Sequence, residues 1–141
     1  MQGVQSTGKT FLLCALAEAV SNGGLVQGTN GLMERIKQGR VLYMSGDDSP
    51  MTITKRLTET FNANRKNICF QAENTTPYIG SPEFAEYFRL KRPDLCIIDT
   101  LQHFLPPRTN MNSTNEVTLA LQPLRILSNN TIAKNLQSFL R

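Results

Sequence analysis

Residues 3–10 read GVQSTGKT, which satisfies the pattern G-x-x-x-x-G-K-[ST] at every fixed position and leads directly into strong helix formers. Glycines let a backbone wrap closely around an anion with successive N–H groups pointing inward, and the start of a helix presents its positive dipole end to the same anion. From average residue frequencies, a chance match arises in roughly one chain of this length in a hundred or fewer. The motif therefore predicts a phosphate-binding loop at the start of a helix.

The chemistry of this loop indicates ATP and Mg²⁺ as its ligands. Lys9 would place a point charge near the β- and γ-phosphates. The hydroxyl of Thr10 offers one hard oxygen to Mg²⁺, which takes its remaining ligands from phosphate, water and a carboxylate. The predicted nucleotide-binding residues are Gly3, Val4, Gln5, Ser6, Thr7, Gly8, Lys9 and Thr10.

Two short apolar runs, 41–45 and 95–98, predict strands of a parallel sheet that is covered on both faces. A third strand is expected at 67–71. Helices are expected over 9–22, about 50–64, 82–90 and 114 to about 127. Strands that alternate with helices predict an α/β fold with a parallel sheet.

Three other segments carry weaker signals. Residues 23–39 hold four glycines and predict a connection with a short helical piece at Leu32 to Lys37. Ser113 to Glu116 has the spacing of a capping box, and Pro123 should kink or restart the helix that follows. Residues 128–141 predict a polar turn and then a weakly amphipathic helix from Ile132 to Leu140.

Acidic residues follow both buried runs, at the sheet edge where ligands of such folds bind. Asp99 comes directly after 95–98 and is predicted to hold a Mg²⁺-bound water. Asp47 and Asp48 follow 41–45, and either could orient or deprotonate an attacking water. The same two acids could equally be turn formers before a helix that starts at Pro50, and their spacing does not distinguish these readings.

Composition excludes several other classes of protein. Cys14, Cys69 and Cys96 lie in apolar stretches without C-x-x-C spacing, which favours reduced, buried thiols of a cytoplasmic protein over a disulfide or zinc framework. No apolar run approaches the ~20 residues of a membrane span, so no membrane partner is expected. The apolar run after Lys9 also resembles a short secretory signal, but the glycine-rich motif before it favours the helix. Scattered basic residues and a net charge of +4 permit a nucleic-acid partner without arguing for one.

Three segments in order resemble RecA-like ATPases of the AAA_25 type, a family that includes plasmid RepA-type replicative helicases and phage helicase–primase proteins. GVQSTGKT is similar to its phosphate loop, GRVLYMSGDDSP to its strand with a following acid pair, and LCIIDTLQHF to its Walker B strand. By this resemblance Asp47 falls where the family usually has a catalytic glutamate, and Asp99 falls on the Walker B acid. The resemblance implies an ATP-driven motor of a DNA replication helicase type, working as a ring of copies on single-stranded DNA.

The likeness covers about Gly3 to Leu127, and two core strands of the family have no counterpart here. Only Met1 and Gln2 precede the phosphate loop, and no apolar strand follows Leu127. We therefore expect an incomplete RecA-like P-loop NTPase, with a partial ATP-binding domain over 1–127 and a divergent tail over 128–141. The alternative is a truncated fragment or regulator that binds nucleotide, or a full-length relative, without turnover.

Overall fold

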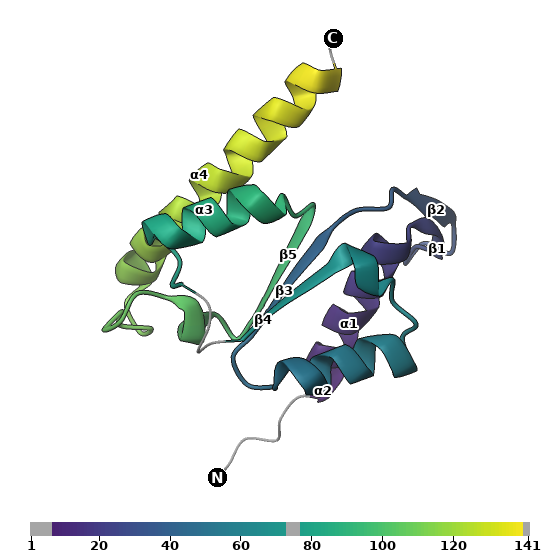
Figure 1. The fold of residues 1–141 in the computed structure, drawn as a ribbon, viewed down its shortest axis with the longest axis horizontal. Coiled ribbons are helices and arrows are strands. Elements are labelled where there is room, and N and C mark those ends of the chain that lie inside the picture. Colours follow the sequence, from purple (N-terminus) through teal and green to yellow (C-terminus); the bar gives the residue numbers. More distant parts are fainter. Residues whose placement is uncertain (1–6, 73–76, 140–141) are drawn as a thin grey trace. The chain divides into compact units, whose positions relative to one another are not determined.

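The computed structural model describes residues 7–72 and 77–139 and contains a sheet of three parallel strands (Figure 1). Their order across the sheet is β4–β3–β5. Their bounds are Val41–Ser45 for β3, Ile68–Ala72 for β4 and Leu95–Asp99 for β5. All five residues of β3 are buried, as its unbroken apolar run requires. The α/β fold with a parallel sheet is thereby confirmed.

The chain divides into two units, and each is described by itself. The sheet unit comprises Met1–Ala72 and Pro93–Asp99, and the helical unit comprises Glu73–Arg92 and Thr100–Arg141. Besides the three parallel strands, the sheet unit contains α1 (Thr7–Asn22), β1 (Gly24–Gln27), β2 (Met33–Ile36), α2 (Pro50–Lys55), the π turn η1 (Arg56–Thr60) and the 3-10 turn η2 (Arg65–Asn67). The helical unit contains α3 (Pro82–Lys91), the 3-10 turn η4 (Leu101–Phe104) and α4 (Thr114–Phe139).

The core of the sheet unit lies between the sheet and the helices α1 and α2. Burial of apolar side chains is the main favourable term that holds such layers together. The buried cluster consists of Cys14 and Ala17 from α1, Val41 and Tyr43 from β3, Ile53 and Leu57 from α2 and η1, Ala63, and Ile97 from β5. This packing fixes the start of α1 relative to the carboxyl ends of the strands.

Strands β3 and β5 run side by side in register. Val41 lies opposite Leu95, and Ser45 lies opposite Asp99. Immediately beyond β3, the backbone N–H of Gly46 donates to the carbonyl of Asp99 over 2.8 Å. The two strands therefore end level with each other, which brings the residues that follow β3 beside the last residue of β5.

A close contact fastens the other ends of the same two strands. The carboxylate of Asp94 accepts from the backbone N–H of Arg40 over 2.8 Å, and the N–H groups of Asp94 and Leu95 donate to the carbonyl of Arg40. A Cβ atom added at Gly39 would lie 2.9 Å from the Cβ of Asp94. Only glycine fits there without displacing the Asp94 side chain or the backbone.

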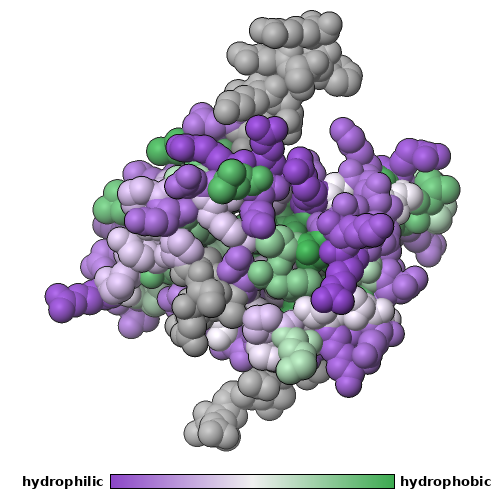
Figure 2. Space-filling view, viewed as in Figure 1, coloured by the Kyte–Doolittle hydropathy of each residue, from purple (hydrophilic) through white to green (hydrophobic). Residues whose placement is uncertain are grey.

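The expectation of a short helical piece at 32–37 was wrong. Residues 24–27 and 33–36 instead pair as an antiparallel hairpin, β1 with β2. The side chain of Asn30 accepts from the backbone N–H of Leu32 over 3.1 Å and closes the turn, a local contact that competes with helix formation. Figure 2 shows apolar surface over this hairpin, where Leu25, Leu32 and Met33 are exposed.

The helix expected over 50–64 is shorter and ends in a different geometry. It is α-helical over Pro50–Lys55 and then widens into a π turn over Arg56–Thr60, where the N–H of Phe61 bonds to the carbonyl of Arg56. The side chain of Ser49 caps the helix. A π turn is rare and recurs at functional sites.

In the helical unit, α3 confirms the expected helix with one residue added, whereas α4 contradicts a restart of the helix at Pro123 and the expected polar turn at 128. The helix runs without interruption over Thr114–Phe139. The proline ring packs towards Gly80, whose φ is +98° and whose added Cβ would lie 3.3 Å from it. The ring of Pro123 therefore lies close to the backbone of Gly80, and a larger side chain at position 80 would crowd it.

The expected capping box at the start of α4 is half formed. The hydroxyl of Ser113 accepts from the N–H of Glu116 over 3.4 Å, but the Glu116 carboxylate accepts from Asn110 instead of turning back to Ser113. Within the described residues, α4 and every other helix are too short or too polar to cross a membrane.

Candidate functional site

The start of α1 positions the described part of the predicted phosphate loop. Gly8, Lys9 and Thr10 lie in its first turn, while the predicted residues Gly3 to Ser6 lie outside the described residues. Lys9 is exposed and Thr10 is partly buried. Backbone N–H groups in the first turn of a helix have no partner within the helix, so this turn offers donors to an anion.

The structure brings Lys9 and Asp99 together from distant parts of the sequence. Asp99 is the last residue of β5, and its Oδ1 lies 3.4 Å from the Nζ of Lys9. The Asp99 side chain is 14% exposed, whereas the Lys9 side chain is 56% exposed. A shielded carboxylate beside an accessible ammonium group is an arrangement that a metal-bound polyphosphate could enter.

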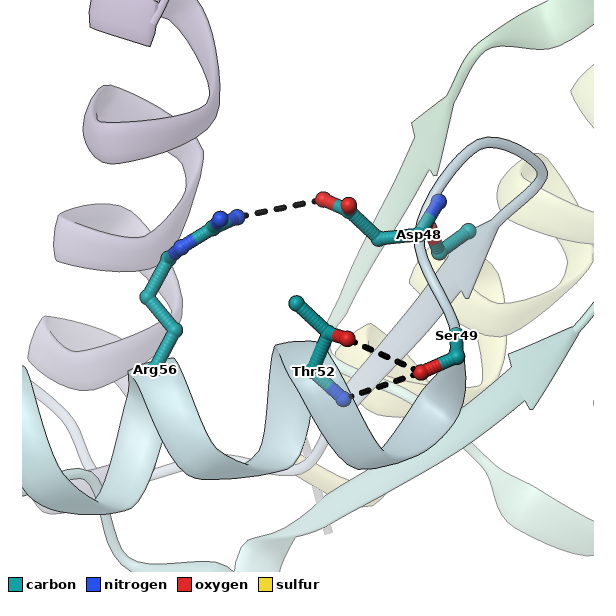
Figure 3. Close-up of polar contacts among 5 residues, drawn as sticks. Asp48, Ser49, Thr52 and Arg56 are labelled. Atoms are coloured by element: carbon teal, nitrogen blue, oxygen red, sulfur yellow. Dashed lines mark hydrogen bonds and ion pairs between the residues drawn. The ribbon is translucent and has the colours of Figure 1, made fainter.

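The two acids after β3 lie in different environments. Asp48 forms an ion pair with Arg56, whose Nη1 lies 3.1 Å from Oδ2 of Asp48 (Figure 3). The backbone N–H of Asp48 also donates to the hydroxyl of Ser45. Asp47 is exposed and lies between Asp48 and Gly46. The structure therefore commits Asp48 to a side-chain ion pair within the protein.

Sequence reasoning did not single out Arg56. It was one of the scattered basic residues. Its separation of eight positions from Asp48 predicts no contact until the exact start of the helix between them is known. The signal that could have found it is an arginine in the second turn after a predicted helix start, because side chains on a helix tilt towards its N-terminus, where the acids lie.

A groove of about 470 Å³ lies next to Arg56. Its lining comes from α1, α2 and η1 and consists of Phe11, Met51, Thr52, Lys55, Arg56, Glu59 and Thr60. The ring of Phe11 packs on Phe61, with ring centroids 5.6 Å apart. Arg56 thus lines the groove and also reaches the turn that follows β3.

Two buried polar groups lie in the core behind the site. Burial raises the pKa of the Cys14 thiol, and the nearby charge of Arg56 opposes this effect. Burial likewise raises the pKa of the Tyr43 hydroxyl far above its usual range. Among the described residues no nitrogen or oxygen partners that hydroxyl, and the polar group beside it is the Cys14 thiol. Both groups are therefore neutral at physiological pH.

The three cysteines form no disulfide among the described residues, and the expected full burial holds for Cys14 alone. Cys14 is fully buried, while Cys69 and Cys96 are partly buried. Burial raises the pKa of the Cys96 thiol to about 12.

The described residues fit a metal ion that takes only one or two ligands from the protein and the rest from phosphate and water. Among residues 7–72 and 77–139, no group of three or more His, Cys, Asp or Glu side chains is arranged to hold a metal ion. The hydroxyl of Thr10 and the carboxylate of Asp99 are hard oxygen donors from the elements that form this site. Mg²⁺ suits such a set, because it commonly binds one or two protein oxygens and completes its octahedron with phosphate and water.

Comparison with protein families identifies a family for most of the chain. A family described as the AAA domain matches residues 2–135. No curated protein matches the chain. Together with the three-stranded parallel sheet, the family match confirms the predicted RecA-like P-loop fold, and the sheet is incomplete within the described residues.

Proposed function

Since the chain belongs to the AAA domain family, and so to a class of nucleotide-binding ATPases, we propose that residues 3–10 and Asp99 form its site for ATP and Mg²⁺. The observation that carries this proposal is the 3.4 Å contact between Lys9 and Asp99. The lysine belongs to the phosphate-loop pattern and the aspartate follows an apolar strand, so two independent sequence signals converge on one place.

Each residue has a distinct role in the proposed site. Lys9 contacts the β- and γ-phosphates, and the first-turn N–H groups of α1 donate to phosphate oxygens. The oxygens of Thr10 and Asp99 hold Mg²⁺, directly or through water. When bound, the metal supplies positive charge to the phosphate oxygens.

We assign Asp47 as the base for hydrolysis. Its carboxylate accepts a proton from a water whose oxygen attacks the γ-phosphorus, while the bond from that phosphorus to the bridging oxygen breaks. The products are ADP and inorganic phosphate. The choice of Asp47 follows the family resemblance, by which Asp47 falls where the family usually has a catalytic glutamate and Asp48 falls on the next acid.

At the finer level, we propose a motor of the DNA replication helicase type that acts in the cytoplasm. The order of the three resembling segments supports this assignment, and it implies a ring of copies around single-stranded DNA. The net charge of +4 is compatible with a nucleic-acid partner. The division into a domain over 1–127 and a tail over 128–141 stays a prediction.

A specific observation favours the alternative of a non-catalytic nucleotide binder. Within the described residues, β5 pairs with β3 on one side and forms the other edge of the sheet. An edge strand is held less rigidly than a central one, and hydrolysis tolerates misplacement of about 1 Å poorly. Binding could therefore survive where turnover does not.

The first experiment tests nucleotide binding. A fluorescent ATP analogue is titrated with Mg²⁺ into the chain, into Lys9→Ala and into the control Lys55→Ala, another exposed lysine. Loss of a charge-assisted contact worth about 1.5–3 kcal/mol should weaken binding by Lys9→Ala about 10- to 100-fold. Lys55→Ala should bind as the unchanged chain does. Equal affinities for all three proteins would contradict the proposal.

Steady-state ATPase measurements then separate the motor from the non-catalytic binder. Turnover that disappears in Asp99→Ala supports the motor, provided that the circular dichroism spectrum is unchanged. Tight binding with no turnover above the level of Asp99→Ala supports the alternative.

A further inference from the structure

We propose that Arg56 is a positioning residue for hydrolysis: through its ion pair with Asp48 it fixes the turn between β3 and α2 and thereby the place of Asp47. This inference rests on the proposed ATP site and adds a residue to it. Arg56 acts through another side chain, so its expected effect falls on the chemical step and not on nucleotide binding.

The turn after β3 is anchored on both sides of Asp47. Before it, the N–H of Gly46 donates to the carbonyl of Asp99 over 2.8 Å, which ties the turn to β5. After it, the N–H of Asp48 donates to the hydroxyl of Ser45 over 3.1 Å. These bonds hold the backbone on either side of the proposed base, but both join the turn to strands.

Arg56 supplies the connection from the turn to the helix. The hydroxyl of Ser49 accepts from the N–H of Thr52 and lies 2.9 Å from the Thr52 hydroxyl, which fixes the first turn of α2. Arg56 reaches back past this capped turn to Asp48 (Figure 3). The next residue, Leu57, is fully buried in the core, so the backbone that carries Arg56 is itself held in place.

The magnitude of this contact favours a role in positioning over a role in stability. The Arg56 and Asp48 side chains are 27% and 37% exposed. Ion pairs this accessible to water contribute at most about 1 kcal/mol. That energy is small against global stability, yet a displacement of about 1 Å at a reacting group can cost on the order of a hundredfold in rate. A weak contact placed beside the base can therefore matter more for turnover than for folding.

The test compares Arg56→Gln and Arg56→Lys with Arg65→Gln, a matched control at an exposed arginine of η2. Binding of the fluorescent ATP analogue, kcat, KM and amide hydrogen exchange are measured on the full chain. Arg56→Gln should bind the analogue within about threefold of the unchanged chain while its kcat falls on the order of tenfold or more. Arg56→Lys keeps the charge and should recover part of the rate. The control should match the unchanged chain.

A double-mutant cycle with Asp48→Asn tests whether Arg56 acts through Asp48. If it does, the double variant should be no slower than Arg56→Gln alone, because the second change removes a contact that is already lost. Additive losses in kcat would overturn the inference, since they would show that the two side chains act separately.

Hydrogen exchange tests the positioning role of Arg56 even if the chain does not turn over ATP. Loss of the Arg56 contact should speed exchange at 46–49 and leave the amides of β3 protected. If the chain turns over ATP, unchanged exchange at 46–49 together with an unchanged kcat in Arg56→Gln would overturn the positioning role. If the chain does not turn over ATP, unchanged exchange at 46–49 alone would overturn it. If Lys9→Ala binds the ATP analogue as tightly as the unchanged chain does, the proposed function is overturned instead. If Arg56→Gln does not fold, the same criteria apply to Arg56→Lys.

Discussion

Strands β3 and β5 end level with each other, yet their carboxyl ends are built differently. At the end of β5, a shielded Asp99 contacts a lysine from the start of α1, which is far away in sequence. At the end of β3, Asp48 pairs with Arg56, eight residues later on the same strand–turn–helix segment. The first pair assembles a site from two elements, and the second stiffens one turn. The comparison separates Asp99, which belongs to the proposed nucleotide site, from Asp48, which we propose holds its neighbour Asp47 in place.

The largest effect is expected when the acid at the end of β5 is replaced, and the same change at the end of β3 tests whether the two strand ends differ. Asp99→Asn should weaken Mg²⁺-dependent binding of an ATP analogue or slow hydrolysis on the order of a hundredfold, because a neutral amide is a poorer partner for the metal. Asp48→Asn should change the affinity by less than about threefold, since it lies outside the proposed metal site. Titrations with and without EDTA measure both. Equal losses in the two variants would remove the distinction between the strand ends.

Alkaline pH should test the burial of β5. Burial raises the pKa of Cys96 from 9.0 to about 12, so above about pH 9 the unfolded chain loses this proton while the folded chain keeps it. The free energy of unfolding should therefore fall between about pH 9 and pH 12, by up to about 1.4 kcal/mol per pH unit from this thiol. Urea unfolding of the unchanged chain and of Cys96→Ala at several pH values measures the slope. A slope that Cys96→Ala leaves unchanged would contradict the assignment.

A smaller effect is expected from the ion pair at the end of β3. Asp48→Ala should lower the free energy of unfolding by about 1 kcal/mol or less, because both partners are partly accessible to water. Lys55→Ala removes the more exposed pair with Glu59, whose atoms are 4.0 Å apart, and should cost less. Urea unfolding at pH 7 compares the two. A loss of several kcal/mol in Asp48→Ala would make the pair a structural requirement and not a positioning contact.

The smallest effect concerns the phenol of β3. Tyr43→Phe should leave stability unchanged or raise it by about 1 kcal/mol, since the hydroxyl is buried without a nitrogen or oxygen partner among the described residues. Thermal unfolding at pH 7 measures this. A marked loss of stability would show that the hydroxyl makes a contact with the Cys14 thiol that outweighs its burial.

The sequence predicted β3 and β5 well because both strands are unbroken apolar runs. Val41–Ser45 matches the expected strand, and Leu95–Asp99 extends its expected strand by one residue. Lys9 and Asp99 could be nominated because each stands at a fixed point of a local pattern. Their contact agrees with the general rule that ligands of such folds bind at the carboxyl ends of the strands.

Features that depend on several contacts at once could not be predicted from local sequence patterns. The β1–β2 hairpin carries exposed apolar residues, so its sequence lacks the alternation that marks a half-buried strand. The continuity of α4 through Pro123 involves packing towards Gly80, which is distant in sequence. The ion pair of Arg56 with Asp48 depends on where α2 begins and on which acid precedes it. Each of these is a property of tertiary structure and not of a local pattern.

The contact between Gly39 and Asp94 has a consequence at the opposite end of the sheet. It aligns the beginnings of β3 and β5, and because the paired segments have equal length, it also determines which residues finish level. A parallel strand rises about 3.3 Å per residue, so a slip of two residues would shift Asp99 by about 7 Å, and a slip of one would turn it to the other face. The substitution Gly39→Ala is therefore expected to disturb the alignment of β3 with β5 and, with it, the position of Asp99 in the proposed metal site.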